Sequence, residues 1–182
     1  SYWSKVEDLK LYANNLYTNL SAPGVDKDNV SDNCITTNYS SYLFNETTIP
    51  STASEAGWTW GNIRNCNFFL TRYQKVQAAP SEVNPYVAEV RFFRALDYFG
   101  KIKQFGDVPW YDKDLQTADT DELYKPRDTR DFVLGKIIED LEFAIQWLPD
   151  ADKAEKGRLN KDAARTQLAR VCLHEGTYKK YH

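Results

Sequence analysis

The sequence predicts an all-α fold, made mostly of helical hairpins with long irregular loops, in one domain covering residues 1–182. Three observations support this prediction. Apolar residues recur at helical spacing in five segments, and Pro or Gly follows most of them. One helical pattern occurs twice along the chain. With 42% hydrophobic and 14% aromatic residues, the chain can also form a substantial core.

The first helix is predicted within residues 1–20, and a long loop follows over residues 21–59. Pro23 and Gly24 end the helix, because neither residue favours its continuation. The loop is rich in Ser, Thr, Asn and Asp, which is typical of surface segments. A structureless loop of this length is uncommon in a compact domain and is often functional. The helix is predicted from apolar residues at Val6, Leu9, Ala13 and Leu16.

The first hairpin is predicted over residues 60–105, with helices at 60–76 and 81–105. Ser81 is the expected N-cap of the second helix, since its hydroxyl can accept from an unpaired amide. This helix carries apolar residues on more than one stripe, so we expect neighbours on several sides. Gly106 is placed for a left-handed C-terminal cap, and Pro109 cannot continue the helix.

An inserted loop over residues 106–128 separates this hairpin from a second one over residues 129–182. The second hairpin is predicted to contain helices at 129–148 and 160–181. Thr129 and Asn160 are the expected N-caps, and Pro149 ends the first of these helices.

The two hairpins share a sequence pattern, Ala-x3-apolar-x-Arg-apolar-x4-Gly. Repetition of a helical hairpin is the signature of an α-solenoid such as the tetratricopeptide type, whose repeat is about 34 residues. The inserted loop makes the period longer here. The pattern occurs first at Ala88, Phe92, Arg94, Ala95 and Gly100, and again at Ala164, Leu168, Arg170, Val171 and Gly176.

Charge and cysteine content narrow the possible partners. The formal net charge is -3, from 23 basic and 26 acidic residues, so we expect no nucleic-acid partner. Cys34, Cys66 and Cys172 are too few and too widely spaced for a disulfide framework or a Cys-x-x-Cys site. The chain contains no Met, so we expect that any targeting or lipid-anchor segment lies outside it.

The sequence offers little for catalysis or metal binding. Its two histidines are His174 and the terminal His182, and Tyr178 stands where a zinc-protease helix needs a second histidine. A calcium loop beginning at Asp26 is a weak alternative, because Val30 and Ser31 stand where a ligand and a glycine are required. We therefore expect no enzyme activity, no cofactor and no metal.

Aromatic residues gather in and beside the long loop. Flat rings next to amide and carboxylate groups suit sugar recognition, because a ring can stack on the apolar face of a pyranose while polar groups meet its hydroxyls. The alternative is that these rings cover the core, which we favour for Trp60. The residues concerned are Tyr39, Tyr42, Phe44, Trp58 and Trp60, with Trp110 and Tyr111 at the start of the second loop.

Several motifs resemble the SusD/RagB family of surface lipoproteins in the Bacteroidetes outer membrane. They cover nearly the whole chain in the family's order, and the run from Arg91 to Pro109 is the most specific. The motifs are Ile63-Arg-Asn-Cys-Asn-Phe-Phe-Leu70, Ala88-Glu-Val-Arg-Phe-Phe-Arg-Ala95, Phe105-Gly-Asp-Val-Pro109, Ile138-Glu-Asp-Leu-Glu-Phe-Ala-Ile145 and Leu168-Ala-Arg170.

The resemblance implies a SusD-like α-α superhelix and a function in nutrient uptake. It predicts a non-catalytic subunit that binds oligosaccharides at the cell surface and works with a SusC-like TonB-dependent transporter. Family members carry a lipid anchor, absent from this chain, and are longer, so we expect an N-terminal portion. An alternative from a different class is a helical-repeat scaffold for protein–protein interaction that binds no sugar in this portion.

The long loop is the predicted sugar site. In the family's characterised starch binder the corresponding loop supplies aromatic stacking, but here its first half contains no tryptophan, so the type of glycan stays open. We predict that Tyr42 and Trp58, with Tyr39, are stacking platforms. The predicted hydroxyl partners are Asp32, Asn33 and Asn38.

Overall fold

The computed structural model describes residues 3–20, 46 and 49–182. The chain divides into two compact units, one formed by residues 1–17 and 61–182 and the other by residues 18–60. The first unit contains the main helices. Each unit is considered by itself below.

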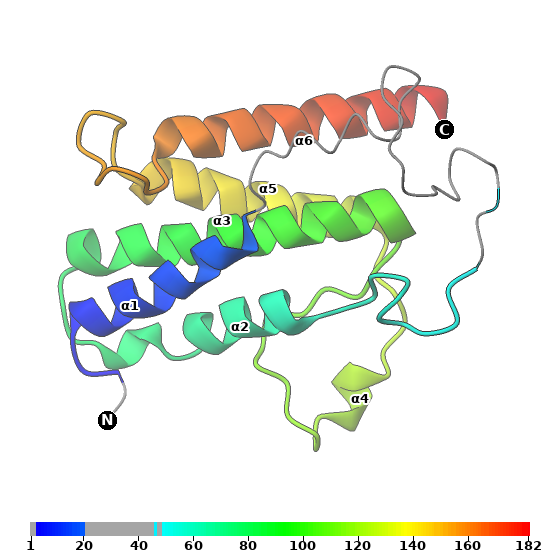
Figure 1. Cartoon of the computed structure of the whole chain (residues 1–182), viewed down its shortest axis with the longest axis horizontal. Helices are drawn as coiled ribbons and strands as arrows, with labels where there is room; N and C mark the ends of the chain where they lie inside the picture. Colours follow the sequence, from blue (N-terminus) through cyan, green and yellow to red (C-terminus); the bar gives the residue numbers. More distant parts are fainter. Residues whose placement is uncertain (1–2, 21–45, 47–48) are drawn as a thin grey trace, which may run out of the picture. The chain divides into compact units, whose positions relative to one another are not determined.

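The first unit is built around one long helix, α3 (Pro80–Phe105). α3 packs against α5 (Arg130–Trp147), α2 (Gly61–Leu70) and α1 (Val6–Leu16), while α6 (Lys161–Tyr181) packs mainly against α5 (Figure 1). A short helix, α4 (Thr120–Leu123), lies in the connection between α3 and α5. The prediction of a mostly helical fold with tetratricopeptide-like hairpins is confirmed.

The N-terminus of α3 lies earlier than predicted. The helix begins at Pro80, and Ala79 rather than Ser81 is its N-cap. Proline suits the first turn because its missing N–H would have no helical partner there. The Glu82 carboxylate also accepts from the Ala79 N–H at 3.2 Å, which satisfies the start of the helix without a serine. At the other end, Gly106 ends α3 as predicted, with a φ of 70° that favours glycine, but its ψ of -113° differs from that of the left-handed cap that was expected.

The predicted caps of α5 and α6 are confirmed. The Thr129 hydroxyl accepts from the Phe132 N–H at 3.3 Å, and the Asn160 side-chain oxygen accepts from the Ala163 N–H at 2.9 Å. α5 ends at Trp147, just before Leu148 and Pro149. These helix ends could be predicted from the sequence because each depends on the type of one local residue.

Two helices are shorter than predicted. α1 spans 11 residues and is followed by the 3-10 turn Tyr17–Asn19, and α2 ends at Leu70, before the 3-10 turn Tyr73–Lys75. Local side chains explain the end of α2. The Thr71 hydroxyl donates to the Asn67 carbonyl at 2.9 Å, and Arg72 Nη1 donates to the Phe68 carbonyl at 3.1 Å. The Asn67 carbonyl also accepts from the Thr71 N–H at 3.0 Å, and the Arg72 N–H donates to the Phe69 carbonyl at 2.9 Å, so backbone and side chains together pair the carbonyls at the end of the helix.

The core surrounds α3, as its apolar pattern predicted. This helix buries residues on several faces, and Tyr98 is the largest fully buried side chain among the residues that the structure describes. α5 contributes one face centred on Ile137 and Leu141. The buried apolar residues of α3 are Val83, Val87, Ala88, Val90, Phe92, Phe93, Ala95, Tyr98, Phe99 and Ile102.

Three bidentate arginine–carboxylate pairs tie the elements together. Arg94 of α3 binds Asp140 of α5 at 2.7 and 2.8 Å. Arg130 of α5 binds Glu175 of α6 at 2.7 and 2.8 Å. Arg158, in the connection between α5 and α6, binds Glu89 of α3 at 3.0 and 2.6 Å. Because each pair makes two parallel hydrogen bonds, it fixes both the orientation and the spacing of the elements that carry the two side chains.

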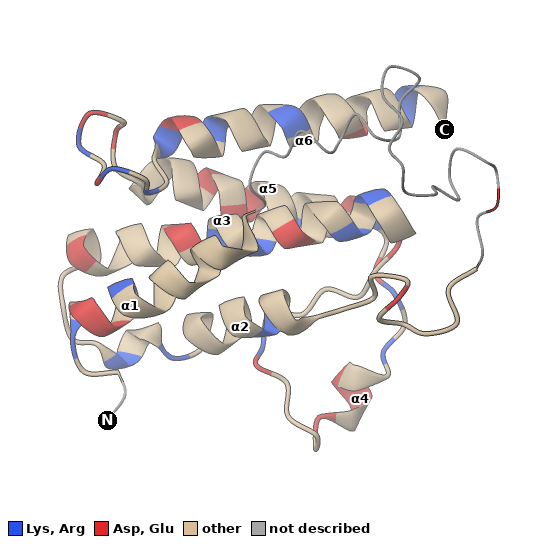
Figure 2. Cartoon of the chain, viewed as in Figure 1, with Lys and Arg blue, Asp and Glu red and all other residues tan. Residues whose placement is uncertain are grey.

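Charged residues of both signs are interspersed along the helices (Figure 2). Within the described part of the chain, no helix is both long and apolar enough to cross a membrane. Cys66 is buried and Cys172 exposed, and neither forms a disulfide. Burial raises the pKa of the Cys66 thiol to about 12, so this residue behaves as a small apolar side chain. Cys34 lies outside the described residues.

Candidate functional site

The predicted sugar loop is described only at its C-terminal end. Trp58 is the one predicted site residue for which the structure gives a position. The other five predicted site residues lie outside the described residues, so their roles stay predictions. They are Asp32, Asn33, Asn38, Tyr39 and Tyr42.

Trp58 follows a tight turn that positions its ring. The Trp58 N–H donates to the Ala53 carbonyl at 2.8 Å, and Gly57 adopts a φ of 74°, a value that favours glycine. Glu55 holds the start of the turn, because its carboxylate accepts from the Ser51 N–H at 3.0 Å and the Ser51 hydroxyl at 2.9 Å. The segment before Trp58 is therefore ordered by its own hydrogen bonds.

The rings of Trp58 and Trp60 pack together edge to face. Their centroids lie 5.1 Å apart with an interplanar angle of 82°, and both residues are half-buried. Aromatic pairs prefer this arrangement. Part of the Trp58 side chain is thus accessible, and Trp60 supports its orientation. The pair can offer a rigid aromatic surface to the apolar face of a sugar.

The second pair of candidate rings, at the start of the inserted loop, has a structural role. Trp110 is only 6% exposed, and its ring lies on Tyr98 with centroids 4.2 Å apart. Burial raises the pKa of the Tyr98 hydroxyl above its ordinary range, and this hydroxyl accepts from the Tyr111 N–H at 2.6 Å. Trp110 therefore belongs to the core, and Tyr111 is half-buried beside it.

A buried polar network holds the inserted loop against α2. Asn67 of α2 donates to the Tyr111 carbonyl at 2.7 Å, and its oxygen accepts from Arg94 Nη1 at 2.9 Å. Arg94 in turn binds Asp140 of α5. The base of the loop is closed by a bridge between Val108 and Asp128. This network places the residues after Tyr111 directly beside α2.

A polar pocket of about 310 Å³ lies where this loop meets α2. The Asp114 carboxylate forms an ion pair with Arg72 at 2.7 Å and faces Arg64 at 3.6 Å. Sequence analysis missed this pocket, because no spacing in the chain links α2 to a residue so far along it. The lining residues are Arg64, Asn65, Phe68, Arg72, Asp114 and Gln116.

The pocket wall formed by α2 is supported from α1. The Tyr12 hydroxyl donates to the Asn65 carbonyl at 2.8 Å, and burial raises the pKa of Tyr12 to about 12. The Phe68 ring stacks with Tyr12 at 6.0 Å on one side, and the Arg72 guanidinium lies 3.8 Å from its centroid. The chemistry available in the pocket is therefore mainly that of its charged and amide groups.

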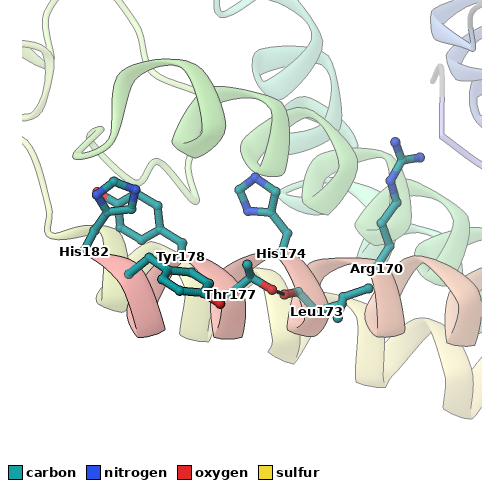
Figure 3. A pocket seen from close by; sticks show the side chains of 7 residues that line it. Arg170, Leu173, His174, Thr177, Tyr178 and His182 are labelled. Carbon is teal, nitrogen blue, oxygen red and sulfur yellow. Dashed lines mark hydrogen bonds between the residues drawn. The ribbon is translucent and has the colours of Figure 1, made fainter.

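A second hollow, of about 440 Å³, runs along α6. Figure 3 shows Arg170, His174 and His182 projecting from the same side of this helix. His174 Nδ1 lies 2.8 Å from Glu175 Oε1, but Glu175 is already bound by Arg130. The Thr177 hydroxyl donates to the Leu173 carbonyl at 2.7 Å. In this hollow the Thr177 hydroxyl is therefore paired with a backbone carbonyl and not with a base.

Metal binding finds no support in the described part of the chain. No group of three or more His, Cys, Asp or Glu side chains is arranged there to hold an ion. The calcium alternative at Asp26, Asp28 and Asp32 lies outside the described residues.

Comparisons with known proteins give a consistent result. Residues 4–173 match the model of the SusD-like family described as "Starch-binding associating with outer membrane". SusD-like protein P2 of Formosa agariphila is 33% identical over 101 residues, which are 55% of this chain and 19% of that protein. The chain therefore spans about a fifth of the length of this curated relative.

Two crystal structures from Bacteroides fragilis share the fold. One, a SusD-like protein, is 29% identical with a TM-score of 0.82, and the match covers 98% of this chain and 37% of that one. The other, a SusD-like carbohydrate-binding protein, is 21% identical with a TM-score of 0.76, covering 98% and 39%. At the lower identity the likeness concerns the fold alone.

Proposed function

Because this chain belongs to the SusD-like family, we propose that it is part of a non-catalytic subunit that binds oligosaccharides for uptake across the outer membrane. The observation that carries the proposal is the family match over residues 4–173, whose description names starch binding and outer-membrane association. The half-buried, rigidly placed Trp58 is consistent with it. The chain spans a minority of its relatives' length.

The finer features of the proposal are the location and the partner. We infer a lipoprotein on the cell surface that delivers its ligand to a SusC-like TonB-dependent transporter. The proposed stacking platforms are Trp58 and Tyr42, with Tyr39 beside them and Asp32, Asn33 and Asn38 as hydroxyl partners. Rings that stack on sugars while amides and carboxylates bind hydroxyls supply both affinity and orientation.

Affinity electrophoresis of the full chain tests this proposal. Gels containing starch, laminarin or xyloglucan form a suitable panel, since structural neighbours are described as laminarin-binding or as holding a xylogluco-oligosaccharide. We expect retention by at least one polysaccharide and loss of that retention in Trp58→Ala and Tyr42→Ala. A contact between a sugar and an aromatic side chain depends on the face of the ring, which substitution by alanine removes.

Matched substitutions separate this effect from general damage. Trp147, a half-buried tryptophan of α5, and Tyr124, which is 86% exposed, are distant in sequence from the predicted loop. Trp147→Ala and Tyr124→Ala should leave retention unchanged. Equal retention of the wild type, Trp58→Ala and Tyr42→Ala would rule out the proposed stacking platforms.

The alternative function is a helical-repeat scaffold that binds a protein and no sugar. One observation favours it, namely that α6 exposes Leu173 at 74% and Tyr181 at 68% beside the hollow. Exposed apolar surface of this kind is typical of protein contacts. Under this alternative no polysaccharide of the panel retards the chain, whereas Leu173→Ser weakens association with a protein partner.

A further inference from the structure

The pocket between α2 and the inserted loop contains a carboxylate with an unused acceptor. The Asp114 side chain is 6% exposed, and its Oδ2 atom is paired with Arg72 at 2.7 Å. Its Oδ1 atom is buried and has no hydrogen-bond partner. Buried carboxylate oxygens are rarely left in this state, because an unmade hydrogen bond to a charged group is costly.

The two arginines of the pocket are held very differently. Arg72 is fixed, because it pairs with Asp114, donates to the Phe68 carbonyl at 3.1 Å and lies over the Phe68 ring. Arg64 is 64% exposed, and its Nε atom lies 3.6 Å from Asp114 Oδ1, beyond hydrogen-bond distance. Arg64 can therefore move toward a ligand at little cost.

The charges of the lining residues do not balance. Two guanidinium groups face one carboxylate, and Arg72 already makes the close contact with that carboxylate. The remaining positive charge belongs to Arg64. A guanidinium binds a carboxylate through two parallel hydrogen bonds, so an acidic ligand satisfies Arg64 better than a neutral one. The amides of Asn65, from α2, and Gln116, from the inserted loop, also line the pocket and suit hydroxyl groups.

We propose that this pocket binds a uronic acid unit of an acidic oligosaccharide. The uronate carboxylate pairs with Arg64, and a neighbouring ring hydroxyl donates to Asp114 Oδ1 where Arg64 moves aside. Asn65 and Gln116 bind further hydroxyls. The inference rests on the proposed carbohydrate-binding function. It adds a class of ligand and a second site, which is made of residues other than Trp58. Recognition here is polar, since Tyr12 and Arg72 already lie against the Phe68 ring.

Isothermal titration of the full chain tests the proposal, with trigalacturonate and trimannuronate as acidic probes and maltotriose as the neutral one. We expect at least one uronate trisaccharide to bind at least tenfold more tightly than maltotriose at low salt. Arg64→Gln should weaken that binding at least tenfold, and added salt should weaken it as well, because the contact is ionic. Asp114→Asn should also reduce it, by replacing a charged acceptor with an amide.

Arg165→Gln is the matched control. Arg165 is 57% exposed on α6 and forms an ion pair with Asp162 at 2.9 Å, so this variant has the same net charge as Arg64→Gln without altering the pocket. It should bind the uronate like the wild type. Circular dichroism melting curves establish that each variant is folded.

Several results would overturn the proposal. They are failure of both uronates to bind, equal binding by maltotriose, and unchanged binding in Arg64→Gln. Competition by sodium sulfate at equal ionic strength as effective as the uronate itself would show a simple anion site. These outcomes are distinct from failure of the proposed function. If the polysaccharide panel still shows retention that depends on Trp58, the chain binds glycans and only the uronate pocket is wrong.

Discussion

α3 and α6 carry the same sequence pattern but place its arginine in opposite environments. Ala88 of α3 and Ala164 of α6 are both completely buried, as expected for small residues where helices approach closely. Arg94 of α3 is 5% exposed and bound to Asp140, whereas Arg170 of α6 is exposed and lines the hollow on that helix.

The difference follows from the neighbours of each helix. α3 is surrounded by α1, α2 and α5, so a carboxylate from α5 meets Arg94 in the interior. α6 packs mainly against α5 and contacts α3 less, with the ring of His174 lying 5.4 Å from that of Phe99, and Arg170 itself stays exposed. A repeated pattern thus determines which face of a helix packs, while the elements placed against that face determine what its arginine does.

The sharpest test of this comparison is removal of Arg94. We expect Arg94→Ala to lower the free energy of unfolding by about 3–5 kcal/mol, because it leaves Asp140 buried without its main partner. Arg91 provides the matched control, since it contacts the same carboxylate at 3.2 Å but is 30% exposed. Arg91→Ala should cost about 1 kcal/mol or less. Urea unfolding measures both, and equal losses would contradict the account.

A smaller effect is expected at the pair formed by Arg158 and Glu89. The Arg158 side chain is 14% exposed, against 6% for Arg94, so the space left by its removal is nearer to solvent and water can partly replace its hydrogen bonds to Glu89. We expect Arg158→Ala to lower the free energy of unfolding by about 2 kcal/mol. The same urea titration measures this loss. A loss as large as that of Arg94→Ala would mean that burial of the arginine does not determine how much each ion pair contributes to stability.

The carboxylates on the two helices should respond to pH in opposite ways. Burial raises the pKa of Glu89 on α3, and Arg158 only partly offsets it. On α6, burial by itself would raise the pKa of the Glu175 carboxyl. Hydrogen bonds from Arg130 and His174 outweigh this effect, so the pKa is lowered. Glu89 therefore favours the folded state below the unfolded pKa, near 4.5, and loses this contribution as pH rises.

Glu175 has the opposite sign, since its contribution is present above its unfolded pKa and is lost as pH falls. Thermal unfolding of the wild type, Glu89→Gln and Glu175→Gln between pH 3 and 7 measures both. The stability difference between wild type and Glu89→Gln should decrease with rising pH, and that for Glu175→Gln should increase. Slopes of the same sign would contradict the assigned directions.

The smallest effect is expected at Arg170. Its side chain is exposed, so Arg170→Ala should change the free energy of unfolding by less than about 0.5 kcal/mol. Urea unfolding beside Arg94→Ala makes the contrast between equivalent positions direct. A loss above about 2 kcal/mol would show that Arg170 has a buried role like that of Arg94.

Local signals explain what the sequence could predict. Thr129, Asn160 and Gly106 act within one turn of their own position, so the helix ends that they define were predicted correctly. The family resemblance, which depends on ordered motifs, is likewise confirmed. The Ser81 cap was wrong because the Glu82 carboxylate and Pro80 together make an earlier start.

Partners that are distant in the chain could not be predicted in this way. Arg94 and Asp140 are 46 positions apart, and nothing in their local sequence links them. The pocket formed by Arg64 and Asp114 depends on how the inserted loop lies against α2, which spacing does not reveal. In the predicted sugar site, Trp58 was proposed from composition and loop position and stays a prediction, whereas its packing on Trp60 was not predicted.

The central proposal is that the packed helices form a scaffold and that Trp58, in the irregular segment before α2, stacks on the oligosaccharide. The five tryptophans are well placed to test it, because each indole N–H gives one signal in a nitrogen–proton NMR spectrum. Titration with an oligosaccharide of the retained polysaccharide should shift the Trp58 signal, assigned with Trp58→Phe, and leave those of Trp3 and Trp147 in place. Shifts confined to Trp3 or Trp147, with Trp58 unmoved, would contradict the claim.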